Sequence, residues 1–204
     1  MPAKNVTKVY LNNTYYHVYN RGHNKQNIFL DEQDFTVFLS LLKRYLDPSC
    51  KDRQANRMPY PCLADEVELI AYCLMPNHFH LFIYQHSEEG MKHLLRRISG
   101  AYGMYFNKKY KRVGPVFQQR YRAVRIAGDE QLMHISRYIH LNPSEYTRWQ
   151  WSSLKYYRSS YARWLKTNHV LELFDNNTEK YLEFVSDYED KRDELQALKQ
   201  ELAG

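Results

Sequence analysis

The sequence predicts an α+β protein with a ferredoxin-like core, in which an antiparallel sheet carries helices on one face, followed by a C-terminal helical extension. Three observations support this fold class. Strand and helix patterns follow one another as β-α-β-β-α-β, and one further helix comes after them. Only a short turn separates the two central strands, which makes them an antiparallel hairpin. With 204 residues, 44% of them hydrophobic, the chain is long enough to bury a core between sheet and helices.

The first elements follow from local patterns. Residues 15–20 are rich in β-forming side chains and precede an Arg-Gly turn, as expected of a strand. Asp31 opens a helix whose apolar residues recur at helical spacing and which ends before Pro48. Residues 49–61 form a basic loop with two prolines, and residues 66–74 form the second strand.

The third strand, residues 78–83, carries two histidines. Successive strand side chains point to opposite faces, so His78 and His80 share one face. The other face carries Phe79, Leu81 and Ile83, which can pack on a core. Two parallel imidazoles on a rigid strand can hold one divalent cation. A bare His-x-His is short enough to arise by chance, however, and two ordinary surface histidines are the alternative.

The remaining core elements are a helix, a strand and a helix. An acidic turn at 87–90 starts a helix with a long apolar side. After a break at Gly114, residues 121–126 form a short strand with basic residues. Asp129 is expected to cap a helix that runs to about Leu141 and is stopped by an Asn-Pro pair.

The last of these helices has a polar stripe. His134, Tyr138 and Asn142 are four residues apart and so line one side, while a separate apolar stripe can dock on the body. A tyrosine becomes a nucleophile when a nearby cation favours its phenolate, and the Asn142 amide oxygen could be a third metal ligand. Tyr138 could instead be a packing aromatic, because the chain has 19 tyrosines.

Three other tyrosines compete for the nucleophile's role. Tyr102 and Tyr105 share the apolar side of their helix, which predicts burial against the sheet. Tyr110 lies among lysines, where stacking on a base is the more natural role. We therefore expect Tyr138 to be the nucleophile.

The charge is unevenly distributed along the chain. The formal net charge is +6 and the pI about 9.1. Residues 91–170 hold 16 basic and 3 acidic residues, a net +13, whereas residues 175–204 have a net charge of −5. This pattern indicates a polyanionic partner such as nucleic acid. The candidate contacts are Arg21, Arg96, Arg97, Lys108, Lys109, Arg112, Arg120, Arg122, Trp149, Trp151 and Arg158.

The C-terminal part divides into two segments. Residues 149–164 are dense in basic and aromatic side chains, which fits either a DNA-contacting surface or a segment that packs its aromatics on the domain. The acidic terminal helix suits an intramolecular brace or a dimer contact, and a homodimer and a monomer are both compatible with the sequence. We divide the chain into an extension (1–14), a core (15–143) and a C-terminal extension (144–204).

Cysteine usage and hydropathy suggest a cytoplasmic protein. The three cysteines lack metal-ligand spacing, and their odd number makes a disulfide framework unexpected. We see no signal peptide and no apolar run long enough to cross a membrane, so no membrane partner is expected.

Several motifs together resemble one family. The His78-Phe79-His80 strand and the segment 138–143 (YIHLNP) are similar to those of single-tyrosine HUH transposases. Segments 16–22 (YHVYNRG), 72–78 (YCLMPNH), 106–110 (FNKKY) and 114–121 further resemble the branch called REP-associated tyrosine transposases. The resemblance covers roughly residues 15–164.

The resemblance implies a role for each matching residue. His78 and His80 would hold Mg²⁺ or Mn²⁺, Tyr138 would be the nucleophile, and Asn142 stands where the family carries a polar metal ligand. Members of the family cut single-stranded DNA near hairpins, forming a 5′-phosphotyrosine bond and a free 3′-OH. The implied protein is a DNA strand-transferase or nickase whose partner is single-stranded hairpin DNA.

Two other functions stay open at this point. The protein could be a domesticated binder of hairpin DNA or RNA that no longer cuts, although a pure binder needs neither the histidines nor Tyr138. It could also be a replication initiator or relaxase with the same metal motif, but those relatives usually order the motifs differently or use two tyrosines.

Overall fold

The computed structural model describes residues 10–47 and 61–187 and contains one four-stranded sheet. The strands are β1 (Thr14–Arg21), β2 (Val67–Met75), β3 (His78–Gln85) and β4 (Arg122–Ile126). They are ordered β2-β3-β1-β4, and every neighbouring pair is antiparallel. β2 and β3 form the predicted hairpin around the Pro76-Asn77 turn. The predicted fold class is confirmed.

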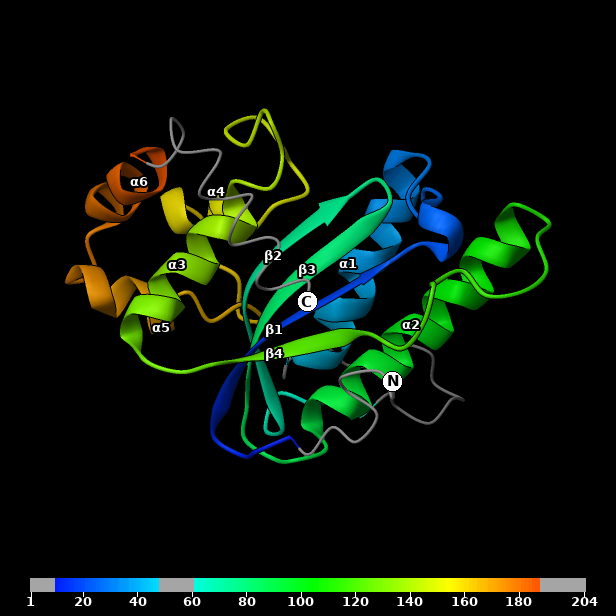
Figure 1. The fold of residues 1–204 in the computed structure, drawn as a ribbon, viewed down its shortest axis with the longest axis horizontal. Helices are drawn as coiled ribbons and strands as arrows, with labels where there is room; N and C mark the ends of the chain where they lie inside the picture. Colours follow the sequence, from blue (N-terminus) through cyan, green and yellow to red (C-terminus); the bar gives the residue numbers. More distant parts are fainter. Residues whose placement is uncertain (1–9, 48–60, 188–204) are drawn as a thin grey trace, which may run out of the picture.

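Six α-helices and two short 3₁₀ segments surround the described sheet. The helices are α1 (Glu32–Leu46), α2 (Gly90–Lys109), α3 (Asp129–His140), α4 (Leu154–Arg158), α5 (Asn168–Leu171) and α6 (Thr178–Ser186). The 3₁₀ segments are η1 (His23–Lys25) and η2 (Glu172–Phe174). In Figure 1, α1 and α2 lie on one side of the sheet and α3 to α6 on the other. None of the described helices is long and apolar enough to cross a membrane.

Two helix starts illustrate how the sequence sets the boundaries. Asp31 caps α1 through a capping box: its side chain accepts from the Asp34 N–H, and the Asp34 carboxylate accepts from the Asp31 N–H. α3 begins differently from the prediction, because Gly128 takes the N-cap position and Asp129 is the first helical residue. Gly128 has φ 87°, a conformation that glycine adopts without strain. Asp129 still places a negative charge in the first turn, where the helix dipole favours it.

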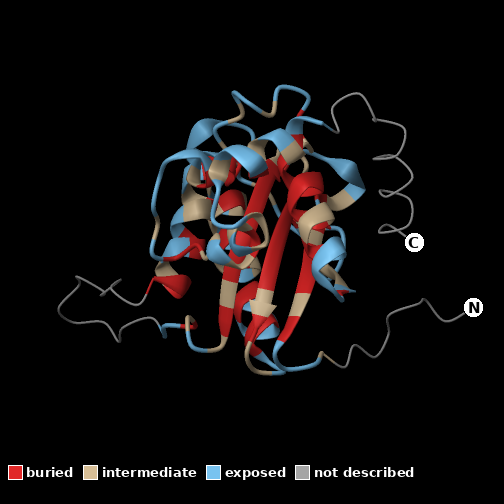
Figure 2. Ribbon diagram, turned by 90° about the vertical axis from the view of Figure 1, so that its left-hand side faces the viewer, coloured by how far each residue is buried: buried red, intermediate tan, exposed pale blue. Residues whose placement is uncertain are grey.

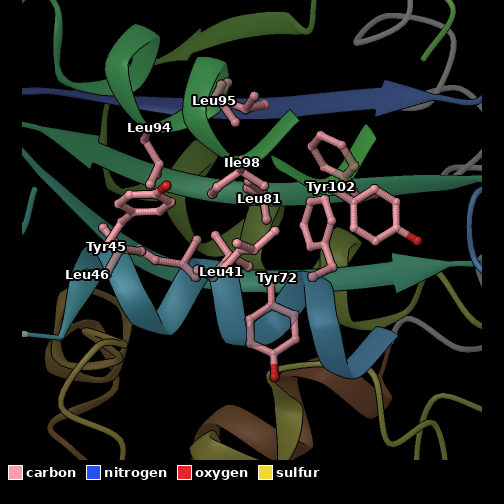
Figure 3. Packing of buried hydrophobic residues seen from close by; sticks show 14 of the residues in the cluster. Leu41, Tyr45, Leu46, Tyr72, Leu81, Leu94, Leu95, Ile98 and Tyr102 are labelled. Carbon is pink, nitrogen blue, oxygen red and sulfur yellow. The ribbon is translucent and has the colours of Figure 1, made fainter. Parts of the chain in front are cut away.

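The larger core lies between the sheet and the helices α1 and α2. Phe79, Leu81 and Ile83 of β3 are buried there, as the alternation of the strand predicted. Figure 3 shows the side chains of both helices meeting those of β2 and β3. Strands β1, β2 and β3 are buried along most of their length, whereas β4 is mostly of intermediate exposure (Figure 2).

A second, smaller core lies on the histidine-bearing face. Apolar residues of the sheet on this face, including Ile70, Ala71 and Phe82, pack against α3, α4 and α6. The C-terminal part therefore covers a portion of the face that the sequence pattern had left open. The rest of that face, toward the start of β3, carries the histidines.

The C-terminal segment also covers the edge strand β2. Leu74 and Lys166 donate backbone N–H groups to, respectively, the Trp151 and Leu69 carbonyls, and Ser153 donates to the Tyr72 carbonyl. Pairing of this kind satisfies edge groups that would otherwise be open to another strand. The predicted loop 49–61 lies almost entirely outside the described residues, and the predicted terminal helix lies in part outside them.

Candidate active site

The pairing of β1, β3 and β4 sets out the floor of the candidate site. His80 lies opposite Tyr19, which in turn lies opposite Arg122 on β4. In the next row toward the end of the sheet, His78 lies opposite Arg21. Because pairs directly across strands share a face, two histidines, a tyrosine and two arginines are gathered at one end of one sheet face.

His78 faces Asn142 at the end of α3. The His78 and His80 rings are 5.0 Å apart between centroids and nearly perpendicular. His78 Nδ1 is 2.6 Å from the Asn77 side-chain oxygen, so Nδ1 carries the proton and donates it. His78 Nε2 lies 3.2 Å from Asn142 Oδ1, so a lone pair of the imidazole faces a lone pair of the amide.

This donor set fits a divalent cation. Two ligand atoms that each lie ~2.1 Å from one ion, at a right angle, are about 3.0 Å apart, close to the spacing of His78 Nε2 and Asn142 Oδ1. No three His, Cys, Asp or Glu side chains gather in a way that could hold a metal within the described ranges. The candidate site has a different composition, with two imidazoles and one amide, and its binding of a metal stays a prediction.

A third histidine, to which the sequence analysis gave no role, belongs to the same cluster. His17 of β1 is 1% exposed, and its Nε2 lies 2.9 Å from His80 Nδ1. The two rings are stacked, with centroids 5.1 Å apart. Burial lowers the pKa of His17 to about 3, so its imidazole is neutral. Only the pairing of β1 with β3, a contact between distant segments, brings it there.

Tyr138 projects from α3 onto these rings. Its ring lies edge-on to those of His80 and His17, with ring centroids 5.4 Å and 5.7 Å away, respectively. Burial raises the pKa of Tyr138 to about 12, while a side-chain hydrogen bond with Asn142 opposes the rise. The protein alone therefore keeps the phenol protonated at neutral pH. The structure thus brings together four of the residues that the sequence singled out: His78, His80, Tyr138 and Asn142.

The third member of the predicted polar stripe points elsewhere. His134 Nδ1 lies 2.7 Å from Arg137 Nη2, and its ring packs near Phe184 of α6. Arg137 also donates to the Phe184 carbonyl at 3.0 Å. His134 therefore belongs to the contact between α3 and α6.

The rival tyrosines are held on the far side of the sheet. The Tyr102 hydroxyl donates to the Ile28 carbonyl, and those of Tyr105 and Tyr110 each donate to Asp34 at 2.8 Å. Tyr110 packs on Phe106 and is bound to a carboxylate, so the base-stacking role expected for it does not fit this placement. These contacts make all three part of the α1–α2 packing.

The predicted DNA contacts are placed unevenly. Lys109 forms ion pairs with Asp31 at 2.7 Å and with buried Asp34 at 2.8 Å, so its charge is already balanced. Arg112 donates to the Gln26 side chain at 3.0 Å. Several others are exposed, namely Arg21, Arg96, Arg97, Lys108, Arg120 and Arg158. Of all these, Arg21 and Arg122 lie on the histidine face beside the candidate site.

The two predicted tryptophan contacts pack on the domain. The Trp149 indole N–H donates to the Leu74 carbonyl at 2.9 Å. Trp151 stacks on Phe35 with centroids 4.8 Å apart. Of the two interpretations of residues 149–164, packing of the aromatic side chains is the one these contacts support.

Comparisons with known proteins identify a family and solved structures to which the chain is similar. The profile of the family described as "Transposase IS200 like" matches residues 10–142. The solved structure of a REP-associated tyrosine transposase bound to a REP hairpin is similar in fold, with a TM-score of 0.56 and 14% identity over 80% of this chain and 91% of that one. A Deinococcus radiodurans protein assigned as a transposase gives a TM-score of 0.41 with 15% identity, over 65% of this chain and 93% of that one. No curated protein matches the sequence.

Proposed function

Because the chain belongs to the IS200-like transposase family, we propose that it cuts and rejoins single-stranded DNA near hairpins, with Tyr138 as the nucleophile. The observation that carries the proposal is the arrangement of Tyr138. Its ring lies against His80, and its hydroxyl shares Asn142 with His78. A nucleophile, two imidazoles and an amide thus converge from β3 and α3.

The reaction we propose is a transesterification. The Tyr138 oxygen attacks the scissile phosphorus, forming a 5′-phosphotyrosine bond, while the bond from phosphorus to the 3′ oxygen breaks. The phenol proton is lost to solvent, and the departing 3′ oxygen takes up a proton in turn. One phosphodiester replaces another, so the strand can be rejoined by the reverse attack without an external energy source.

His78, His80 and Asn142 would hold the divalent ion. Bound there, Mg²⁺ or Mn²⁺ would polarise the scissile phosphate, stabilise charge on the leaving oxygen and favour the phenolate. Two imidazoles and an amide are a neutral set with little oxygen, which suits Mn²⁺ better than Mg²⁺. Phosphate oxygens and water would complete the coordination.

Hairpin DNA is the partner we propose. The similar solved structure holds a REP hairpin, and in this chain Arg21 and Arg122 lie beside the candidate site on the same sheet face. Guanidinium groups there could contact phosphates on either side of the scissile bond. Tyr19, half-buried between His80 and Arg122, offers a ring on which an unpaired base could stack.

The test is a covalent adduct. The protein is incubated with hairpin-bearing single-stranded DNA and Mn²⁺, and the products are resolved on a denaturing gel. Tyr138→Phe removes one hydroxyl, so DNA affinity should persist while the adduct disappears. Changing His78 and His80 together to Ala should also abolish it. Tyr105→Phe is the matched control, because that hydroxyl is bound to Asp34 on the other face.

Two results would contradict the proposal. An adduct formed by Tyr138→Phe but not by Tyr105→Phe would show that the wrong tyrosine has been assigned. Tight hairpin binding by the unmodified protein without any adduct, in Mn²⁺ or Mg²⁺, would instead identify a binder that does not cut.

A further inference from the structure

His17 contacts a residue of the candidate site on β3, His80, and one on α3, Tyr138. It lies in the middle of β1, opposite Phe82 of β3 and Val124 of β4. Its Nε2 is 2.9 Å from His80 Nδ1, and the Tyr138 ring stands edge-on to it at 5.7 Å. One buried imidazole therefore touches a candidate metal ligand and the candidate nucleophile.

A cation on His80 would fix where the protons of the two hydrogen-bonded imidazoles lie. His80 can offer Nε2 to a cation only if its proton is on Nδ1. That proton is then donated to His17 Nε2, so His17 must carry its own proton on Nδ1. With a cation on His80 Nε2, this bond holds the His80 proton on Nδ1 and also sets the angle of its ring.

The other nitrogen of His17 shows that this position is not optimised for stability. His17 Nδ1 is buried and has no hydrogen-bond partner among the described residues. A buried donor left unpaired is unfavourable, and an aromatic hydrocarbon ring would fill the same space without that penalty. The imidazole at this position gains one thing that such a ring would lack, the bond to His80.

We propose that His17 is a positioning residue, which holds the metal-binding tautomer and orientation of His80 and supports the ring of Tyr138. This inference rests on the proposed function, because it assigns His80 to a cation. It concerns a residue that would touch neither the metal nor the DNA. Groups in this position behind metal-ligating histidines typically change metal affinity or activity 10- to 100-fold when they are removed.

Two substitutions separate positioning from packing. His17→Phe keeps a ring against Tyr138 but removes the acceptor, whereas His17→Gln can place an amide oxygen near the former Nε2. Tyr16→Phe is the matched control: Tyr16 is the adjacent buried residue of β1, it faces the opposite side, and its hydroxyl accepts one hydrogen bond from the Leu11 N–H. Each Phe variant thus loses one hydrogen bond made by a buried side chain of β1.

The main readout is Mn²⁺ affinity, measured by calorimetry on the full chain without DNA. His17→Phe should bind Mn²⁺ about 10- to 100-fold more weakly, while its thermal unfolding midpoint without metal is equal to or above that of the unmodified protein. His17→Gln should recover part of the affinity. Tyr16→Phe should bind Mn²⁺ normally. Hairpin affinity without metal should be the same in all four proteins.

The outcomes also distinguish this inference from the proposed function. Unchanged Mn²⁺ affinity in His17→Phe overturns the inference, even if adducts form normally. A fall in affinity that only parallels a lower unfolding midpoint overturns it too, because packing alone would explain that result. If the unmodified protein binds Mn²⁺ and His17→Phe binds it more weakly, but no adduct forms, the proposed cutting fails and the positioning role stands.

Discussion

His17 and His140 are both buried, yet their hydrogen bonding differs. Burial lowers the pKa of each to about 3. Both His140 nitrogens are bonded, Nδ1 to the Tyr181 hydroxyl and Nε2 to the Ser153 hydroxyl, each at 2.7 Å. His17 has one bonded nitrogen, and its partner is His80.

The difference separates a structural histidine from one that we assign to function. His140 ends α3 and ties it to α6 and to the segment before α4, so its bonds hold the helix that carries Tyr138 on the sheet. A fully satisfied buried network of this kind stabilises one arrangement of the elements. His17 joins two residues of one site and leaves one ring nitrogen unpaired. Stability explains the first histidine better than the second.

The same substitution at both positions should give the largest difference. His140→Phe removes two buried hydrogen bonds and adds volume to a packed site, so we expect a loss of about 3 kcal/mol in unfolding free energy. His17→Phe should change it by less than about 1 kcal/mol. Urea unfolding at pH 7.5 measures both. Equal losses in the two variants would show that hydrogen-bond satisfaction does not distinguish the histidines.

Acid should reveal the burial of His140 with a smaller effect. Above pH 6.5 the imidazole is neutral in the folded and unfolded chains, so it adds no pH dependence. Below pH 6.5 the unfolded chain binds a proton that the folded chain refuses until about pH 3. Stability therefore falls as pH falls, by about 1.4 kcal/mol per unit, or about 2 kcal/mol at pH 5.

The control for this effect is His140→Phe itself, which has no imidazole to titrate there. Urea unfolding of that variant at pH 7.5, 6 and 5 should show a correspondingly shallower decline than the unmodified protein. Parallel declines would mean that His140 is not kept neutral by the fold.

Local patterns were sufficient to predict most of the fold and part of the site. The alternation of β3 placed His78 and His80 on one face. The spacing of four residues placed Tyr138 of α3 and Asn142, two residues after the end of that helix, on one side. The capping box at Asp31 is likewise a signal within four residues. Each of these depends only on the period of one element or on its start.

The rest depends on contacts between distant segments. His17 reaches the site through the register of β1 against β3, 63 residues away in the sequence. His134 and Tyr138 share a side of α3, but the docking of α6 engages His134 and its neighbour Arg137. Lys109 lies in a basic run of the sequence, yet its charge is neutralised by Asp31 and Asp34 at the start of α1. Periodicity within one segment contains none of this information.

Removing one hydroxyl should make His140 resemble His17. Tyr181→Phe deletes the partner of His140 Nδ1, leaving one ring nitrogen buried and unpaired while the bond to Ser153 remains. The same hydroxyl also donates to Ser136 at 3.2 Å. We expect a loss of about 1 kcal/mol in unfolding free energy, within the range for an unpaired buried group. Tyr102→Phe is the control: it deletes a buried hydroxyl far from this network whose hydrogen-bond partner is the Ile28 backbone carbonyl. The excess over that control then measures how much more an unpaired buried imidazole nitrogen costs than a backbone carbonyl that loses one hydrogen bond. A total loss near zero in Tyr181→Phe would mean that an unpaired imidazole nitrogen is tolerated without penalty in this fold, and the stability argument that sets His17 apart from His140 would lose its basis.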